Sequence, residues 1–372
     1  MRRIKKTTIT PFYSLDTILS LDCQYNVIFG ERSNGKTYSV LEYGIKRFWS
    51  TGEQMAIVRR WKEDFKGKRG PTMFDSLVAN GVIEEMTGGE YTNVIYYRSC
   101  WFLARKDDKD NMIKMDKPIA YAFSIGDMEH DKSTSYPNIT TILFDEFLTR
   151  KNYINDEFVL FMNTVSTIVR YRDNVTIFML GNTVNQYCPY FNEMGIRHVR
   201  DMQPGDIDCY KYGNSGLKVA VEYCGEVANN KKSNVYFAFD NPKLQMITGG
   251  IWEVALYPHL PVKYKPKDIV FTYFISFNGD LLQCEIINCD NSIFTYIHNK
   301  TTPLKDETSD IVYSPEDSHR PNWRKRITKG RDKIDNVVLS FFKNEKVFYQ
   351  DNSVGEVVRN YLLWCSTPIV KA

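Results

Sequence analysis

The chain has 372 residues, of which 43% are hydrophobic and 25% are charged, a length and composition that predict about two folded domains and exclude intrinsic disorder. Its 48 Lys and Arg nearly balance its 45 Asp and Glu, which leaves a formal charge of +3. Any nucleic-acid surface must therefore be a local basic patch, because the chain as a whole is not a polycation.

The cysteines and the apolar segments limit where the protein can work. The eight cysteines include no CxxC pair, and the five histidines show no ligand spacing beside them, so we expect reduced thiols in a cytosolic protein. No stretch approaches about 18 apolar residues, and the basic residues 1–6 are followed by polar residues. The sequence therefore predicts neither a signal peptide nor a transmembrane helix.

Residues 24–224 alternate short β-rich runs with helical segments, which is typical of a mostly parallel sheet covered by helices. Several runs are apolar on both faces, as buried parallel strands are. Residues 91–105 resemble an inserted hairpin. The predicted strands are 25–29, 55–59, 101–104, 119–124, 141–144, 176–180 and 218–223, and the predicted helices are 36–49 and 157–169.

The texture of the sequence changes after Cys224, where residues 228–234 are polar and indicate a boundary. From residue 268 onward a strand, an Asn278-Gly279 turn and a returning strand give a hairpin signal. The expected strands are 269–277 and 281–287, and the expected helices are 337–348 and 354–364. We therefore predict a first domain at 1–226, a linker segment at 227–265 and a second domain at 266–372.

Residues 30–37 (GERSNGKT) match the pattern GxxxxGK[ST] directly between a predicted strand and a predicted helix. Backbone N–H groups of such a loop wrap phosphates, and the helix N-terminus adds partial positive charge. Lys36 is expected to reach the β- and γ-phosphates, and Thr37 to ligate Mg²⁺. ATP and Mg²⁺ are thus the predicted cofactors. The expected contacts come from Gly30, Ser33, Asn34, Gly35, Lys36 and Thr37.

An acidic pair, Asp145 and Glu146, ends the apolar strand 141–144, which is what the second half of a nucleotide site requires. Asp145 is expected to hold Mg²⁺ through water, and Glu146 to polarise the attacking water. Two acids at the end of a strand are common by themselves, so their predicted function depends on their pairing with the phosphate loop.

Arginines that could face the γ-phosphate lie in two places. Arg170 and Arg172 follow the helix after Glu146, where either could be an arginine finger toward a neighbouring subunit. A solvated helix end explains them equally well. Arg32 lies inside the phosphate loop and could act within its own subunit.

Two further strand ends are expected beside the site. Asn182, just after strand 176–180, is placed to contact the attacking water or the γ-phosphate, with Gly181 permitting close approach. Arg59 and Arg60 end strand 55–59, which should lie beside the strand that carries the acidic pair. There one of the two arginines could pair with Glu146 and hold it inactive.

Two basic segments interleaved with aromatic residues are candidates for nucleic-acid contact. Residues 59–70 have six Lys or Arg against two acids, and residues 320–333 have seven against one. A run of charges is often only a solvated face, so the pattern leaves both interpretations open. The candidate contacts are Lys62, Lys66, Lys68, Arg69, Arg324, Lys325, Arg326 and Lys329.

At these motifs the chain resembles the DNA-packaging ATPases of phi29-like podophages, small relatives of the terminase large subunits. The resemblance covers residues 24–192 and is faint beyond 230. The segments that carry it, in order, are VIFGERSNGKTY, GEQMAIVRRWK, SYPNITTILFDEF, VRYRDNV and MLGNTVNQYCPYF. It implies an α/β P-loop ATPase domain of the additional-strand catalytic-glutamate (ASCE) class and a small α+β second domain with an RNase H-like nuclease fold.

The resemblance also implies residue roles and partners. It carries Lys36, Thr37, Asp145 and Glu146 over as Walker A and Walker B residues, and Arg170 as the finger in trans. The implied assembly is a homo-oligomeric ring, expected to be a pentamer, docked on a viral portal or connector and threading double-stranded DNA into a procapsid. It would work in the host cytoplasm without a membrane, and a structural RNA partner is left open.

The second domain departs from working nucleases. Where the first strand of that fold normally offers a metal-binding Asp, the sequence reads FISF at 274–277, with Ser276 where an acid belongs. Asp280, Glu285 and Asp290 are nearby, and Asp280 is expected to point to solvent at the hairpin tip. We therefore expect loss of DNA cleavage.

Other functions are less well supported. A full terminase that also cuts DNA would need an intact acidic cluster in the second domain. A nucleotide-dependent assembly switch without translocation would need neither a positioned base nor a trans finger, so Glu146 and Arg170 argue against it. A GTPase is disfavoured because no NKxD segment follows the phosphate loop.

Overall fold

The computed structural model describes most of the chain and divides it into two compact units, Met1–Glu253 and Val254–Ala372. Most of the predicted linker at 227–265 lies outside the described residues, so the three-part division stays a prediction. No described helix has the length and apolar character needed to cross a membrane. The described residues are 1–6, 12–126, 134–149, 153–154, 156–183, 187–213, 215–225, 256–260, 262–306, 308–316 and 318–366.

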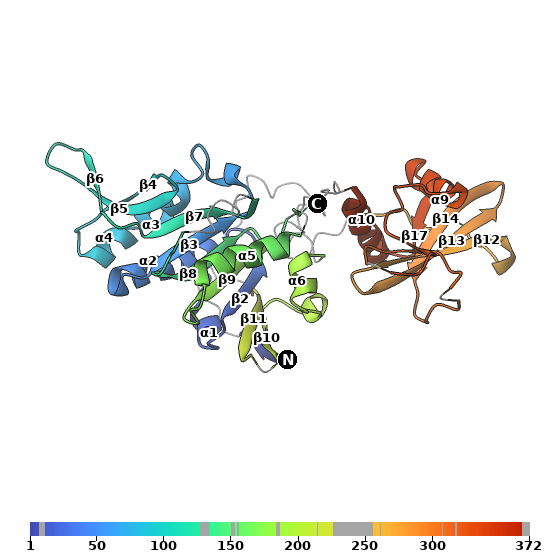
Figure 1. The fold of residues 1–372 in the computed structure, drawn as a ribbon, viewed down its shortest axis with the longest axis horizontal. Coiled ribbons are helices and arrows are strands. Elements are labelled where there is room, and N and C mark those ends of the chain that lie inside the picture. Colours follow the sequence, from blue (N-terminus) through green and yellow to red (C-terminus); the bar gives the residue numbers. More distant parts are fainter. Residues whose placement is uncertain are drawn as a thin grey trace. The chain divides into compact units, whose positions relative to one another are not determined.

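Unit 1 is built on one large mixed sheet (Figure 1). Its described strands are β1 Arg2–Lys5, β2 Tyr25–Gly30, β3 Gln54–Arg59, β4 Asn93–Tyr97, β5 Cys100–Lys106, β6 Met112–Lys114, β7 Ala120–Ser124, β8 Ile139–Asp145, β9 Thr176–Asn182, β10 Asp206–Tyr212 and β11 Leu217–Tyr223. They lie in the order β1-β10-β11-β2-β9-β8-β3-β7-β5-β4, with β6 beside β5. The run from β11 to β7 is parallel. Strand β9 lies between the phosphate-loop strand β2 and β8. It is therefore β9 that corresponds to the additional strand of the ASCE class.

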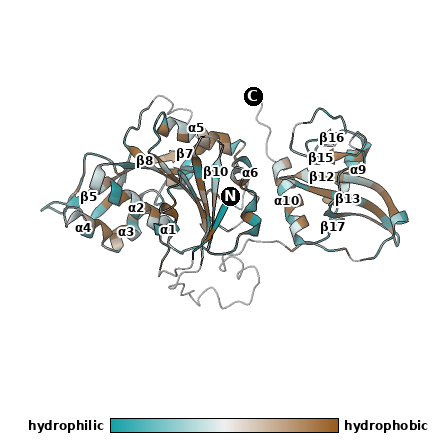
Figure 2. Cartoon of the chain, turned by 90° about the horizontal axis from the view of Figure 1, so that it is seen from below, coloured by the Kyte–Doolittle hydropathy of each residue, from teal (hydrophilic) through white to brown (hydrophobic). Residues whose placement is uncertain are grey.

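Helices cover both faces of this sheet. They are α1 Asp16–Leu19, α2 Lys36–Thr51, α3 Asp75–Ala79, α4 Val82–Thr87, α5 Glu157–Val169 and α6 Pro189–Glu193, with 3₁₀ turns η1 Lys62–Phe65, η2 Pro71–Phe74 and η4 His198–Asp201. Val27 and Phe29 of β2 pack into the core on the α5 and α6 side, whereas Ile28 packs on the α2 side. Burial on both faces is why these strands read as continuous apolar runs, and Figure 2 shows the hydrophobic colour along them.

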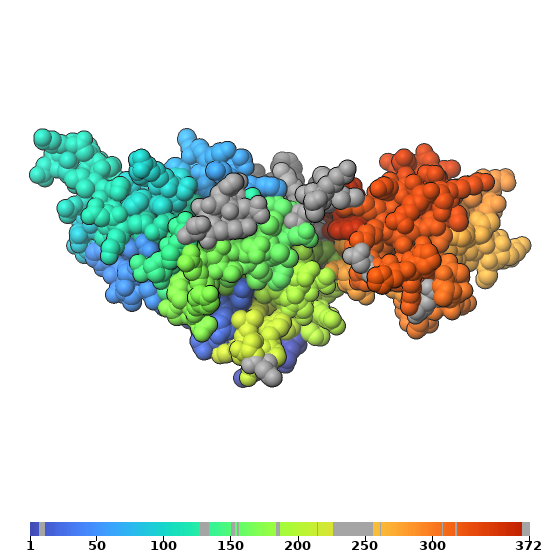
Figure 3. Space-filling view, in the orientation of Figure 1, coloured from blue at the N-terminus to red at the C-terminus, as the bar shows by residue number. Residues whose placement is uncertain are grey.

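The seven predicted strands of unit 1 are confirmed within two residues at their ends, and the predicted hairpin is β4–β5. Strand β5 continues into the β5–β6 loop, which projects from the rest of unit 1 (Figure 3). Strands β1, β6 and β10 were not predicted, because their sequences are charged or exposed rather than apolar.

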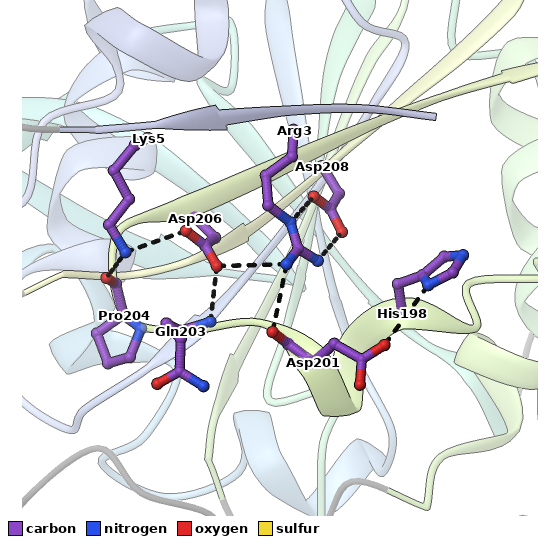
Figure 4. A network of polar contacts seen from close by, with 8 residues as sticks. All are labelled: Arg3, Lys5, His198, Asp201, Gln203, Pro204, Asp206 and Asp208. Carbon is purple, nitrogen blue, oxygen red and sulfur yellow. Dashed lines mark hydrogen bonds and ion pairs between the residues drawn. The ribbon is translucent and has the colours of Figure 1, made fainter.

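Ion pairs hold the β1–β10 edge of the sheet. The guanidinium of Arg3 donates to both carboxylate oxygens of Asp208, at 2.6 and 2.7 Å, and Lys5 Nζ lies 3.0 Å from an oxygen of Asp206 (Figure 4). Asp208 is fully buried. Cross-strand charge pairs thus replace apolar packing at this edge.

Unit 2 is a smaller α+β domain. Its described elements are η5 Pro266–Asp268, β12 Ile269–Phe277, β13 Asp280–Cys289, β14 Ser292–Asn299, β15 Val312–Tyr313, β16 Trp323–Arg324, α9 Lys333–Lys343, β17 Val347–Tyr349 and α10 Asn352–Ser366. The sheet has the order β16-β15-β12-β13-β14-β17. Strands β12 to β14 form an antiparallel meander, and the outer strands add in parallel. This mixed arrangement agrees with the expected RNase H-like class.

Two local features of unit 2 test the sequence prediction. Asn278 and Gly279 both have positive φ, 56° and 87°, as a two-residue hairpin turn requires, so that prediction is confirmed. The helix predicted at 337–348 is present as α9, but both of its predicted ends are wrong. It begins at Lys333, because the carboxylate of Asp332 accepts a hydrogen bond from the backbone N–H of Asp335 and caps it. It ends at Lys343, and the residues after it form β17.

Candidate active site

The phosphate loop joins β2 to α2, and both of its glycines are required by the backbone. A Cβ on Gly30 would lie 2.8 Å from the Cβ of Cys224, which is closer than real Cβ contacts. Gly35 precedes the first turn of α2 with φ of 96°, a conformation that side chains rarely adopt. The loop can therefore turn tightly and expose its N–H groups at the start of a helix.

Lys36 is buried at the base of this loop. Its Nζ donates to the carbonyl oxygen of Glu31 at 2.6 Å and to Oδ1 of Asn34 at 3.1 Å. Burial lowers the pKa of Lys36, and the negative charges of Asp145, Glu31 and Glu222 partly oppose that shift. Phosphate oxygens can replace the loop oxygens as partners of the ammonium group.

Thr37 and Asp145 come together from α2 and the end of β8. Thr37 Oγ1 donates to Oδ1 of Asp145 over 3.2 Å, and the Asp145 side chain is 7% exposed. A hydroxyl and a carboxylate at this separation, beside a phosphate loop, fit a Mg²⁺ ion that keeps several of its waters. The two residues predicted to hold the metal are thus neighbours in space.

Arg59 reaches both acids from the end of β3. Its guanidinium lies 2.6 Å from Oδ2 of Asp145 and 2.9 Å from Oε2 of Glu146. Strand β3 pairs in parallel with β8, Val58 opposite Phe144, which brings these strand ends together as predicted. The side chain of Glu146 is otherwise open, with 64% exposed, and its φ is 62°.

Arg60, the other candidate partner of the Glu146 side chain, is placed differently. Successive side chains leave a strand on opposite sides, and Arg60 is buried on the α5 side. It binds the carboxylate of Glu157 and the backbone carbonyl oxygens of Glu146 and Phe147. The interpretation of Arg60 as a partner of the Glu146 side chain is therefore wrong, and Arg59 alone of the two makes that contact.

A cleft of about 460 Å³ brings the predicted nucleotide residues together. It is lined by Arg32, Ser33, Asn34, Gly35, Lys36, Thr37, Tyr38, Arg59, Asp145, Glu146, Leu180, Gly181 and Asn182. Tyr38 and Leu180 were not predicted. Tyr38 directly follows the GKT motif, so its position was a usable signal, whereas Leu180 looked like an ordinary core residue.

Asn182 lies opposite Gly30 in the register of β9 and β2, which places it at the mouth of the phosphate loop. Gly181 is needed for packing: a Cβ there would lie 2.9 Å from the side chain of Leu148. Arg32 is exposed at the loop tip. Both polar side chains border the cleft where a γ-phosphate would lie.

The arginines that follow α5 lie near the start of β8, at the opposite end of that strand from Asp145. Arg172 donates to backbone carbonyl oxygens of Pro137 and Ile139, which precede and begin β8, whereas Asp145 ends that strand. Burial lowers the pKa of Arg172. Arg170 is exposed and donates to the carbonyl oxygen of Thr134 at 2.8 Å. Neither arginine lines the cleft of its own subunit.

The basic segment after β3 lies on the surface. Lys62, Lys66, Lys68 and Arg69 are all exposed along η1 and the turn that follows it. Lys66 also pairs with Glu63 at 2.9 Å. The segment begins with Arg59 and Arg60, which contact the acidic turn, so it leaves the sheet at the end of β3 that borders the cleft.

The second basic segment is partly built into the fold of unit 2. Arg324 binds the carboxylates of Asp332 and Asp335 and is 12% exposed. Arg326 donates to the carbonyl oxygen of Cys365 at 2.5 Å and lies over the ring of Trp364. These contacts give Arg324 and Arg326 a structural use, and their contact with nucleic acid stays a prediction. Among the candidates there, Lys325 and Lys329 are exposed.

The described acids of the second domain do not converge. Glu285 accepts hydrogen bonds from Tyr264 and Gln283, both at 2.6 Å, and faces His298. Burial would raise the pKa of Glu285, but these donors lower it below its ordinary value. Asp280, which was expected to point to solvent, is half-buried at the start of β13. Within the described residues, no three His, Cys, Asp or Glu side chains are grouped to hold a metal.

Comparison with known proteins places this site in a family. Residues 8–202 match the Podovirus DNA encapsidation proteins (Gp16). The chain belongs to this family. The predicted resemblance is therefore confirmed, and the matched region contains every residue that lines the cleft.

Curated relatives agree with this assignment. The DNA packaging protein of Bacillus phage phi29 is 32% identical over 184 residues, which are 48% of this chain and 49% of the relative. The DNA packaging protein of Bacillus phage B103 is 31% identical over 183 residues, or 48% of this chain and 50% of the relative. The chain thus spans about half the length of the curated relatives that it matches.

Solved structures extend the likeness of fold to both units. A chain in the structure of the bacteriophage Phi-29 viral genome packaging motor assembly aligns with this protein at a TM-score of 0.56 and 21% identity. The alignment covers 94% of this chain and 97% of the chain in that structure. A structure of the Phi-28 gp11 DNA packaging motor aligns with 97% and 99%, at a TM-score of 0.54 and 16% identity. At these identities the comparison shows the fold alone.

Proposed function

We propose that this protein is the ATPase of a viral genome-packaging motor, which couples ATP hydrolysis to movement of double-stranded DNA into a procapsid through a portal. The observation that carries the proposal is the contact of Thr37 with Asp145, beside Glu146 and below a glycine loop. The packaging proteins that the chain resembles supply the substrate class.

In the proposed reaction the loop N–H groups and Lys36 hold the β- and γ-phosphates. Thr37 and Asp145 would hold Mg²⁺, whose charge offsets the negative charge that develops on the phosphates. Glu146 orients the attacking water and accepts a hydrogen bond from it. Asn182 and Arg32 border the same cleft and supply a further amide and a further cation toward the γ-phosphate.

Arg59 defines the resting state of the site. While it binds both acids, the Glu146 carboxylate is paired with a cation instead of an attacking water, and Asp145 shares its carboxylate with a cation that would compete with Mg²⁺. For Thr37 and Asp145 to hold Mg²⁺ and for Glu146 to orient a water, Arg59 would have to release both carboxylates. Such a step makes slow hydrolysis the default of the unstimulated protein.

The proposed partners follow from the exposed groups. Arg170 is a candidate to reach the cleft of a neighbouring subunit, because it lies far from its own, and a homo-oligomeric ring, expected to be a pentamer, would provide that neighbour. Lys62, Lys66, Lys68 and Arg69 offer positive charge for the DNA backbone. The portal or connector and the procapsid are the remaining proposed partners, in the host cytoplasm, and a structural RNA is left open.

We further propose that the second domain binds without cutting. Lys325 and Lys329 are candidates for the contact with nucleic acid or a partner. Two-metal cleavage needs several converging carboxylates, whereas Glu285 is already held by Tyr264 and Gln283. This favours the packaging motor over a full terminase with an active nuclease.

The test is ATP hydrolysis with procapsids and DNA present or absent. The parental protein is expected to hydrolyse ATP slowly alone and faster with both. Glu146→Gln should still bind ATP and Mg²⁺ but hydrolyse very slowly, because the amide cannot accept a proton. If procapsids and DNA did not raise the parental rate of hydrolysis, an assembly switch would be favoured. Hydrolysis by Glu146→Gln at the parental rate would show that another residue is the base.

A further inference from the structure

The turn that carries Glu146 holds a strained backbone conformation. Glu146 has φ of 62°, in the left-handed region that non-glycine residues rarely adopt. Its side chain is mostly exposed and has Arg59 as its ion-pair partner. The position of the Glu146 carboxylate therefore depends mainly on how its backbone is fixed.

Arg60 fixes that backbone. One terminal nitrogen of its guanidinium donates to the carbonyl oxygen of Glu146 at 3.2 Å, and the other donates to the carbonyl oxygen of Phe147 at 2.8 Å. The N–H of Phe147 donates to the carbonyl oxygen of Leu180 at 3.0 Å. The turn is thus held on one side by β3 and on the other by β9.

Glu157 in turn fixes Arg60. The two side chains form a bidentate pair at 2.8 Å for both bonds, and both are buried. Glu157 also accepts from the hydroxyl of Tyr190 at 2.9 Å and from the backbone N–H of Ile154 at 2.8 Å. The guanidinium lies over the ring of Tyr153. Arg60 therefore has little freedom to move without α5 and α6.

A buried ion pair of this kind is not needed for stability alone. Well-packed apolar residues of similar size often stabilise a core as well, because two charges lose their hydration on burial. What an apolar pair cannot do is donate to two backbone carbonyl groups at fixed angles. Fixing the geometry of the acidic turn is therefore the function that the Arg60 and Glu157 pair is suited to.

We propose that Arg60 is a positioning residue for hydrolysis, which holds the backbone of Glu146 and connects it through Glu157 to α5. The inference rests on the proposed ATPase function. The exposed part of the basic segment begins at the next residue, and Arg170 directly follows α5. If DNA binding displaces that segment, Arg60 would transmit the displacement to the backbone of Glu146, and Glu157 would transmit it to α5, the helix that leads to Arg170.

The main test removes both charges at once, so that neither is left buried without a partner. Arg60→Met with Glu157→Leu is made in the full chain. The matched control is Arg3→Met with Asp208→Leu, which removes another bidentate pair, at the β1–β10 edge (Figure 4). Each protein is measured for thermal unfolding, for binding of a fluorescent ATP analogue, and for kcat and KM of ATP hydrolysis with procapsids and DNA.

The Arg60 and Glu157 double variant is expected to fold and to bind nucleotide like the parent, with kcat lowered by about 10²-fold, because misplacement of a catalytic group by about 1 Å has that effect. The control should keep its kcat. Parental kcat in the double variant would overturn the inference. A parent that hydrolyses no ATP would instead overturn the proposed function itself.

A second variant covers the case in which the double variant does not fold. Arg60→Lys keeps the charge next to Glu157 but has one nitrogen, which cannot reach the carboxylate and both carbonyl oxygens together. It should lower kcat by about 10-fold or more without raising KM. Parental kcat in a folded Arg60→Lys protein would contradict the inference, because a purely structural charge pair would be preserved.

Discussion

Lys36 illustrates how a single buried cation can be prepared for a ligand. Its ammonium group is surrounded by loop oxygens of Glu31 and Asn34, and burial lowers its pKa. Those partners are weak substitutes for phosphate oxygens, which carry full negative charge. The ammonium group of Lys36 is thus placed to form stronger hydrogen bonds with the phosphates of ATP than with its own loop.

Lys36→Ala should abolish ATP hydrolysis while leaving the protein folded. The substitution removes a phosphate contact, but the loop conformation depends on Gly30 and Gly35 rather than on Lys36. Turnover measured by phosphate release, alongside circular dichroism, checks both parts. Normal hydrolysis by a folded variant would show that the loop does not bind the transferred phosphate.

Arg59 is expected to restrain hydrolysis when DNA is absent, because it occupies both acids. Arg59→Ala should therefore raise unstimulated ATP turnover and reduce the stimulation that procapsids and DNA produce. The measurement is the ratio of stimulated to unstimulated kcat. An unchanged ratio would mean that the ion pair does not define the resting state.

At the scale of elements, helix α5 joins the acidic turn to a distant edge of the sheet. Its first residue, Glu157, holds Arg60, and its last turn leads to Arg170 and Arg172. These two arginines differ in their contacts and exposure. Arg172 is tied to backbone carbonyl oxygens around the start of β8, whereas the guanidinium of Arg170 lies at the surface.

Arg170→Ala should bind ATP but lose its stimulated hydrolysis by about 10³-fold, as expected for a finger in trans. Mixed into parental rings, it should depress their activity, because each variant subunit leaves a neighbour without its cation. Arg172→Ala is the matched comparison and should instead lower the unfolding temperature, because it leaves partly buried carbonyl oxygens without their donor. Full activity of Arg170→Ala with loss in a folded Arg172→Ala would move the finger two residues along.

The parallel strands and the cleft could be predicted because their signals are local. Strand β8 is apolar on both faces and ends in two acids, and the phosphate loop is a contiguous motif. Strand β10 was not predicted because its Asp206 and Asp208 are stabilised by Arg3 and Lys5, about 200 residues away. Alternating charges in such a strand look like loop sequence until their partners are known.

The functions of the basic residues were harder to predict for the same reason. Arg60 and Glu157 are 97 residues apart in the chain, so no local pattern separates Arg60 from Arg59. Arg324 was a candidate for nucleic-acid contact, although Asp332 and Asp335 follow it by only 8 and 11 residues. There the net charge of the segment concealed its internal ion pairs.

At the scale of the whole molecule, the two units carry different chemistry. Unit 1 contains the cleft and the residues that match the family. Unit 2 has a mixed sheet, and its Glu285 is bound by the protein donors Tyr264 and Gln283. The proposed division is an ATPase with an appended domain that binds without cutting.

The full chain should not nick plasmid DNA in Mn²⁺, because two-metal cleavage needs several converging carboxylates and Glu285 is already held by Tyr264 and Gln283. Conversion of supercoiled to relaxed plasmid, followed on agarose gels, provides the measurement. Metal-dependent nicking that Asp280→Ala or Glu285→Ala abolishes would instead support an active terminase.

The central claim is tested most directly by the amount of DNA that procapsids protect from DNase. The parental protein, with procapsids, double-stranded DNA and ATP, should yield protected DNA that accumulates with time. Glu146→Gln should bind ATP yet yield none, because translocation requires hydrolysis. Protection by Glu146→Gln at the parental rate, or an ATP-hydrolysing parent that never protects DNA, would contradict the account.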